Sequence, residues 1–116
     1  MKIDELTKIF KALSDNNRVR ILKMLELKPL CVCEIKSILG IATSTTSKHL
    51  SILREAGLIF DQKDNKWVNY HLNRASRNIV IRAMLPLLTN WMNDERVITI
   101  DREKVKSTDR INLCKL

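Results

Sequence analysis

Residues 40–59 read GIATSTTSKHLSILREAGLI, and this stretch decides the fold. Gly40 suits the end of one helix, because glycine adopts the left-handed conformation of a helix C-terminus at little cost. The polar run that follows leads into Leu50 and Leu53, so a second helix has one apolar face. Its opposite face offers hydroxyls, an ammonium and an imidazole. A helix, a glycine turn and a helix with a polar outer face predict a helix-turn-helix that ends near Gly57.

Three helices are predicted up to the glycine turn. Apolar residues recur at helical spacing from Ile3 to Leu13, and Ser14 or Asp15 offers a break and a new N-cap before the period resumes. Pro29 closes the second helix, because the residue before a proline avoids the helical region. A third, short helix carries the apolar residues Val32, Ile35, Ile38 and Leu39.

Two alternating runs downstream predict a β-hairpin. The runs LIFDQ (58–62) and WVNYHL (67–72) flank the polar segment KDNK (63–66), which is expected to form a four-residue link. Four helices and a hairpin with a basic tip have the layout of a winged helix-turn-helix, in which the second helix of the motif enters the major groove of DNA.

The remaining third of the chain is predicted less sharply. An apolar stripe runs from Ala75 to Met92 and predicts a long helix, which Pro86 either kinks or restarts. The tail, residues 93–116, is rich in charges of alternating sign, and its apolar residues recur at a less regular spacing. It is therefore predicted to be either helical or an arm that becomes ordered only when it packs. We therefore divide the chain into a DNA-binding and dimerisation domain, 1–92, and a C-terminal extension, 93–116, that carries Cys114.

Composition agrees with one mainly helical domain. The chain has 116 residues, 45% of them hydrophobic, and only 2 Gly and 2 Pro, which argues against a many-stranded sandwich or barrel. The expected fold class is mainly α with a small β-hairpin, in the order ααααββα. With 21 Lys and Arg against 13 Asp and Glu, the net charge of +8 favours a polyanionic partner. Eight basic and three acidic residues lie between Lys36 and Arg82, around the predicted DNA-binding elements.

Other classes of protein are disfavoured. No apolar run approaches the roughly 18 residues of a membrane span, and the first ten residues lack the pattern of a signal peptide. We expect a cytoplasmic protein with no membrane partner. An enzyme is the least favoured class, because the sequence shows no glycine-rich phosphate loop, nucleophile elbow or paired-carboxylate pattern.

The cysteines indicate metal or redox chemistry. Cys31 and Cys33 are separated by one residue, which is poor geometry for a structural disulfide, and Cys114 is the only other thiol. On an ideal helix residues i and i+2 point about 200° apart, so both sulfurs are expected to bind one ion only if the first turn deforms. A helix N-terminus is also expected to lower the pKa of these thiols.

Four stretches together resemble the ArsR/SmtB family of bacterial and archaeal winged-helix repressors. They are LSDNNRVRILKML (13–25), CVCEI (31–35), TSTTSKHLSILREAGLI (43–59) and KWVNYHL (66–72). The similarity covers roughly residues 4 to 92, and its most specific part is the string SKHL (47–50). The resemblance implies a homodimer that binds double-stranded operator DNA and leaves it when an inducer binds.

The resemblance also assigns DNA-facing residues. It places the recognition helix over the polar run and the wing tip near two lysines, giving as candidates Thr43, Ser44, Thr45, Ser47, Lys48, His49, Lys63 and Lys66. Where relatives often have a capping serine and a base-reading glutamine, this chain has Ala42 and Thr43, so capping is expected to shift to Thr43. His71, in the second strand, is expected to be structural.

Similar sequences in the arsenite-responsive branch place their inducer thiolates at the position of Cys31-Val32-Cys33. Trivalent arsenic or antimony prefers three thiolates, but Lys36 replaces the third cysteine of that branch. Cys114 is therefore the candidate third ligand, from its own chain or from the partner's. Zinc or cadmium would want four ligands. No histidine follows His71, so the helix-end zinc site of the family is not expected.

These observations favour a dimeric repressor that senses arsenite or antimonite. Two alternatives stay open. In the first, the thiols form a redox switch in which Cys31 or Cys33 pairs with Cys114 or with the partner chain. In the second, the winged helix is a protein or RNA interaction module with inert cysteines.

Overall fold

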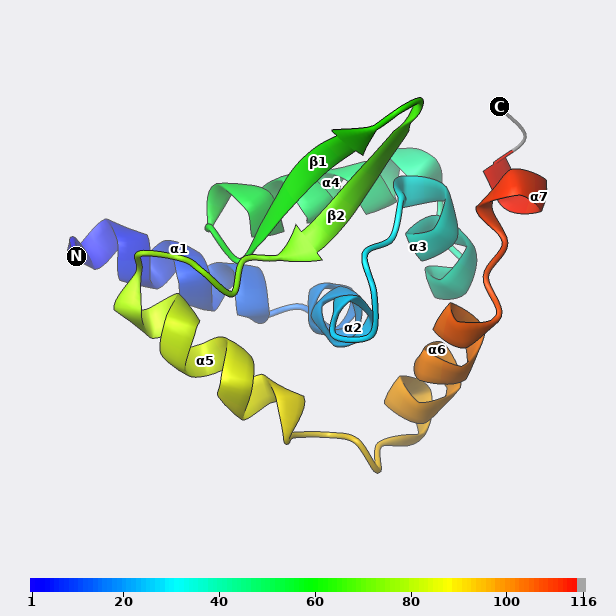
Figure 1. The fold of residues 1–116 in the computed structure, drawn as a ribbon. Coiled ribbons are helices and arrows are strands. Elements are labelled where there is room, and N and C mark those ends of the chain that lie inside the picture. The colour runs from blue at the N-terminus through cyan, green and yellow to red at the C-terminus, as the bar shows by residue number, and fades with distance from the viewer. Residues whose placement is uncertain (115–116) are drawn as a thin grey trace.

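The computed structural model describes residues 1–114, and its elements follow the predicted order (Figure 1). Four helices precede a hairpin and a fifth helix, as expected, and two further helices occupy the tail. The elements are α1 (Ile3–Leu13), α2 (Asn16–Leu25), α3 (Val32–Leu39), α4 (Thr43–Glu55), β1 (Ile59–Asp64), β2 (Trp67–Leu72), α5 (Ile79–Thr89), α6 (Arg96–Lys106) and α7 (Arg110–Cys114). Among the described residues, no helix has the length and apolarity needed to cross a membrane.

The core is built around α2, which Figure 1 shows nearly end-on in the middle of the molecule. Asp15 caps this helix and accepts hydrogen bonds from the backbone N–H groups of Asn17 and Arg18. Ile21 and Leu22 are fully buried, and α1, α4, β2 and α6 all contact α2. Because α2 is covered on several sides, it fixes how the helix-turn-helix, the hairpin and the tail sit relative to one another.

The hairpin has a shorter link than predicted. The strands pair from Ile59 with Leu72 to Asp64 with Trp67, so the turn contains only Asn65 and Lys66. The expected four-residue link is wrong because β1 extends beyond its apolar start: after Ile59 every residue of the strand is exposed, and a projecting strand needs no buried side chains. Asn65 takes a positive φ of 57°, a conformation that asparagine tolerates in tight turns.

The helix that follows the hairpin is shorter than its apolar stripe. It begins at Ile79 because the Asn78 side chain accepts hydrogen bonds from the backbone N–H groups of Val80 and Ile81, and it ends at Thr89. Pro86 lies inside the helix. Met92, which we expected to be helical, has a positive φ of 65° and lies in the connection to α6.

The tail is helical because its charged residues find partners in the core. Arg20 of α2 forms a two-pronged ion pair with Asp101 of α6, with distances of 2.7 Å and 2.9 Å. Asp101 is almost fully buried, and Ile98 and Val105 on the same helix are buried as well. The buried face of α6 therefore consists of two apolar residues and one paired carboxylate.

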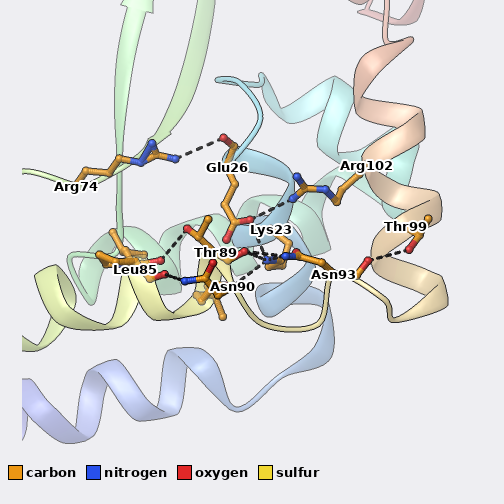
Figure 2. Close-up of polar contacts among 11 residues, drawn as sticks. Lys23, Glu26, Arg74, Leu85, Thr89, Asn90, Asn93, Thr99 and Arg102 are labelled. Atoms are coloured by element: carbon orange, nitrogen blue, oxygen red, sulfur yellow. Dashed lines mark hydrogen bonds and ion pairs between the residues drawn. The ribbon is translucent and has the colours of Figure 1, made fainter.

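A buried lysine joins three elements (Figure 2). Lys23 of α2 is fully buried, and its Nζ donates to the carbonyl of Leu88 at 2.8 Å and to Oδ1 of Asn93 at 2.9 Å. The same ammonium pairs with Glu26 at 2.9 Å, and Arg102 of α6 reaches that carboxylate at 3.2 Å. A cation at the C-terminal end of α5 is favourable, because the last carbonyls of a helix carry partial negative charge.

We expect Lys23→Met to lower the free energy of unfolding by about 3 kcal/mol, because it leaves the carboxylate of Glu26 buried with one partner fewer. Urea denaturation followed by circular dichroism measures the change. Lys28→Met is the matched control: Lys28 is exposed, so its replacement should change the free energy by no more than about 0.5 kcal/mol. Equal stability of the two variants would contradict the role given to Lys23.

Candidate functional site

The structure brings the three cysteines together. Their Sγ atoms all lie within 4.8 Å of one another, and the Sγ atoms of Cys31 and Cys114 are 3.7 Å apart. Cys31 is buried, whereas Cys33 and Cys114 are partly exposed. Cys114 thus meets the pair of its own chain. We call these three residues the thiol centre.

The first two sulfurs converge without any distortion of α3. Cys31 is the N-cap, with extended backbone angles of φ −88° and ψ 168°, and the helix begins at Val32. The 200° separation holds only for two residues inside a helix. The expected deformation of the first turn is therefore wrong, because Cys31 stands outside the helix and its side chain is already directed toward that of Cys33.

A buried glutamate connects α3 to the tail that carries Cys114. Oε1 of Glu34 accepts a hydrogen bond from the backbone N–H of Cys31 at 3.1 Å, and Oε2 accepts one from the hydroxyl of Thr108 at 2.8 Å. Arg110 of α7 lies 3.8 Å from Oε1 through its Nε. Our sequence reasoning missed Glu34, although the spacing Cys-x-x-Glu has the form of a capping box with cysteine at the cap.

The thiol of Cys31 is less acidic than expected. Burial raises the pKa of Cys31, and the hydrogen bond from the backbone N–H of Glu34 lowers it by less. Burial also raises the pKa of Cys114, with further increases from the neighbouring sulfurs of Cys33 and Cys31. For Cys31, the expectation of a lowered pKa is wrong because the cost of burying its thiolate outweighs the effect of the helix N-terminus. Both thiols therefore keep their protons at neutral pH.

The predicted DNA-facing residues lie on exposed parts of α4 and the hairpin. Along α4, Thr46, Leu50 and Leu53 are buried, while the exposed candidates are Thr43, Ser44, Thr45, Ser47 and Lys48. Lys63 is exposed in β1 opposite Val68, and Lys66 is exposed in the turn. These side chains make no ion pair among residues 1–114, so their charges are free to meet a phosphate.

The start of α4 differs from the prediction. Its N-cap is Ala42, which offers no side-chain acceptor, and Thr43 is the first residue of the helix. The prediction that Thr43 caps the helix is wrong, because Ala42 has the extended backbone angles of an N-cap, with φ −65° and ψ 151°, and Thr43 already lies inside the helix. The hydroxyl of Thr46 donates back to the carbonyl of Ala42 at 3.0 Å.

His49 is half-buried and is held by a residue that our sequence reasoning missed. Arg18 lies 3.2 Å from its Nδ1. A guanidinium only donates hydrogen bonds, so Nδ1 accepts and Nε2 carries the proton. Arg18 is itself held by hydrogen bonds to the carbonyls of Ala12 and Lys11. His71 stacks on Phe60 with ring centroids 4.9 Å apart, which agrees with the structural role expected for it.

Comparison with known proteins identifies the family. The model of the "Bacterial regulatory protein, arsR family" matches residues 15–60. The "Arsenic resistance transcriptional regulator ArsR2" of Pseudomonas putida is 33% identical over 93 residues, which cover 79% of this chain and 70% of that protein. The chain belongs to the ArsR family. This confirms the resemblance stated from the motifs around residues 13–72.

Further ArsR-family relatives carry different names. The "Arsenical resistance operon repressor" of Escherichia coli is 44% identical over 66 residues, which cover 56% of each protein. The homologue of the cadmium resistance regulatory protein CadC in Staphylococcus aureus is 41% identical over 70 residues, covering 60% of this chain and 58% of that protein. This ArsR-family chain thus matches little more than half the length of each of these two relatives.

A solved structure confirms the fold. A winged helix-turn-helix DNA-binding domain from Mycobacterium bovis superimposes with a TM-score of 0.65 at 22% identity, over 82% of this chain and 83% of that one. The expected fold class, mainly α with a small hairpin in a winged helix-turn-helix, is therefore confirmed for this ArsR-family chain.

Proposed function

We propose that this chain is a transcriptional repressor that leaves its operator DNA when arsenite or antimonite binds Cys31, Cys33 and Cys114. The observation that carries the proposal is the convergence of three sulfurs within 4.8 Å, at the start of the helix that precedes α4. Trivalent arsenic and antimony take three thiolates in a pyramid, and the thiol centre offers three sulfurs. The names of the arsenic-resistance relatives support the same inducer.

Protonated thiols suit this ligand. Arsenous acid is neutral and carries three hydroxyl groups on As(III). Each thiol forms one As–S bond, one As–O bond breaks, and the thiol proton leaves with the hydroxyl as water. Three thiols therefore replace three hydroxyls without a change of oxidation state and without net release of protons. The raised pKa values of Cys31 and Cys114 do not hinder such an exchange.

X-ray absorption at the arsenic edge tests the proposed ligands. With one equivalent of arsenite, the native protein should show three sulfurs and no oxygen around arsenic. Cys114→Ser should show two sulfurs and one oxygen, because Cys31 and Cys33 stay in place at the start of α3. A shell of oxygen alone in the native protein would contradict the thiol centre as the inducer site.

Cadmium is the second candidate inducer, because a relative of comparable identity is named for cadmium resistance. The three sulfurs could serve as three of the four ligands that such ions usually take in proteins. Cd²⁺ would have to displace the thiol protons, and this difference separates it from arsenite in the pH experiment described below.

The proposed DNA contacts combine α4 with the hairpin. We propose that the exposed hydroxyls of α4 contact base edges in the major groove and that Lys48, Lys63 and Lys66, which are also exposed, contact phosphates. Nε2 of His49 carries a proton in the geometry set by Arg18, so it can donate to a phosphate or a base.

Lys48→Ala should weaken binding to operator and random duplex alike and should reduce the slope of log K against log salt by about one, because one phosphate is no longer neutralised. Ser47→Ala should instead reduce the preference for the operator, since a base contact carries the sequence information. Fluorescence anisotropy at several salt concentrations measures both effects. Lys104→Ala, which removes the same charge from α6, is the control. Equal weakening on both duplexes for Ser47→Ala would argue against its base-facing role.

We also propose that the repressor is a homodimer that pairs through α1 and α5. These helices expose apolar side chains that a second copy would bury: Ile3, Phe10, Ile79 and Leu87. Leu88, also on α5, is buried in the core of its own chain and is not available to a partner. A symmetric dimer presents two copies of α4 to two half-sites.

A further inference from the structure

The thiol centre is fastened to the hairpin by the residue that precedes it. Leu30 forms a β-bridge with Tyr70 of β2: the N–H of Tyr70 donates to the carbonyl of Leu30 at 2.8 Å, and the N–H of Leu30 donates back at 3.3 Å. Leu30 is fully buried. The backbone at Cys31 and the middle of β2 therefore hold a fixed position relative to each other.

A second connection reaches the tip of the hairpin. The guanidinium carbon of Arg110 lies 5.1 Å from the ring centre of Trp67, within the range of a cation–π contact. Trp67 is the first residue of β2 and directly follows Lys66 in the turn. Arg110 begins α7, and Cys114 ends it. Figure 1 shows α7 beside α3, on the side of the molecule toward which the hairpin tip points.

The two connections differ in the interactions that stabilise them. The Leu30 bridge belongs to the core, whereas α7 has five residues and none of them is buried. A helix this short is not stable by itself in water. Its place depends on the ion pair of Arg110 with Glu34, on the stacking over Trp67 and on the sulfur of Cys114. A ligand that binds all three sulfurs needs α7 in this docked position.

We propose that the thiol centre acts on DNA binding through α7 and the hairpin tip, and this inference rests on the function proposed above. Inducer binding holds α7 against α3 and thereby holds Arg110 on Trp67. The hairpin, already anchored at Tyr70, is then anchored at its tip as well, in an orientation that is poor for DNA. By linkage, DNA weakens inducer binding by the same factor.

Arg110→Gln tests this coupling. Operator affinity is measured by anisotropy with and without saturating arsenite. The affinity without arsenite divided by the affinity with arsenite reports the coupling. The native ratio is expected at about 5 to 150, and Arg110→Gln should reduce it by about two- to fivefold, the range of an exposed cation–π contact. Lys104→Gln, which removes an exposed positive charge from α6, should keep the native ratio.

The arsenic-edge spectrum of Arg110→Gln should still show three sulfurs, which separates a failure of coupling from a failure of binding. An unchanged ratio in this variant would overturn the inference, whether or not its affinity for DNA falls without arsenite. If arsenite fails to bind the native protein or to release its DNA, the proposed function itself fails. The two failures are therefore distinguishable.

Trp67 provides a readout that needs no DNA. In a Trp91→Phe background, Trp67 is the only tryptophan, and arsenite should change its emission as α7 becomes held over the ring. Adding Arg110→Gln should remove most of that change, while Lys104→Gln should leave it intact. A change of equal size in both variants would also overturn the inference, since the signal would not pass through Arg110.

Discussion

Cys31→Ser and Cys33→Ser should each keep the protein on its operator at arsenite concentrations that release the native chain. Removal of one sulfur leaves As(III) with two strong ligands and weakens its binding, so at these arsenite concentrations the loss of operator affinity, about 5- to 150-fold in the native chain, should fall to near onefold. Serine is a good N-cap, so Cys31→Ser should preserve the start of α3. Operator affinity without arsenite should therefore match the native value, which serves as the control for folding.

The same variants separate the inducer from a redox switch. The sulfurs of Cys31 and Cys114 are 3.7 Å apart, so a small movement would allow a disulfide. A redox regulator would leave DNA on addition of an oxidant without arsenite and return with a reductant. Release of the Cys31→Ser, Cys33→Ser double variant by arsenite, as efficient as release of the native protein, would show that the thiol centre is not the sensing site.

Cadmium and arsenite should differ sharply in their dependence on pH. Because burial raises the pKa of Cys31 and of Cys114, both thiols are protonated at neutral pH. Cd²⁺ must displace these two protons, so its affinity should rise with pH by up to about a hundredfold per unit. Arsenous acid takes up each proton as water, so its affinity should stay nearly constant between about pH 6 and 8.

Isothermal titration in buffers of different ionisation enthalpy measures the protons released at each pH. Cys114→Ser should lower the number of protons released on cadmium binding by one, because one protonated thiol is removed. The number released on arsenite binding should stay near zero. An arsenite affinity that rises with pH as steeply as that of cadmium would contradict the protonated thiols.

The order of the elements was predictable where one face of an element is buried. Helical spacing identified α1 to α4, and Gly40 marked the turn between α3 and α4. The length of β1 was not predictable, because after Ile59 the strand buries no side chain and so leaves no alternating pattern. The fold of the tail was not predictable for another reason. Arg20 and Asp101 are 81 residues apart, and the sequence does not show which distant charge a given charged residue will pair with.

The composition of the thiol centre was predictable, but its geometry was not. Three cysteines and the ligand number of arsenic suggested the set. Whether Cys31 lies inside or outside α3 depends on one backbone conformation, and this decides whether the sulfurs meet. Glu34 and Arg110 escaped notice because each looks like an ordinary surface charge in sequence. Their roles come from burial of the carboxylate and from the closeness of Trp67.

Cys31 and Cys114 stand 83 positions apart in the chain, which would give the proposed inducer a mechanical role as well. An ion held by Cys31 and Cys33 alone would tie together near neighbours. An ion held by all three sulfurs closes a loop through most of the polypeptide, as a disulfide would. In the chain-entropy model a loop of this size forfeits freedom of the unfolded chain worth roughly 4.5 kcal/mol. The inducer would thus stabilise the folded protein while it releases the DNA. The inducer-bound, DNA-free repressor would then resist thermal unfolding and proteolysis better than the free protein.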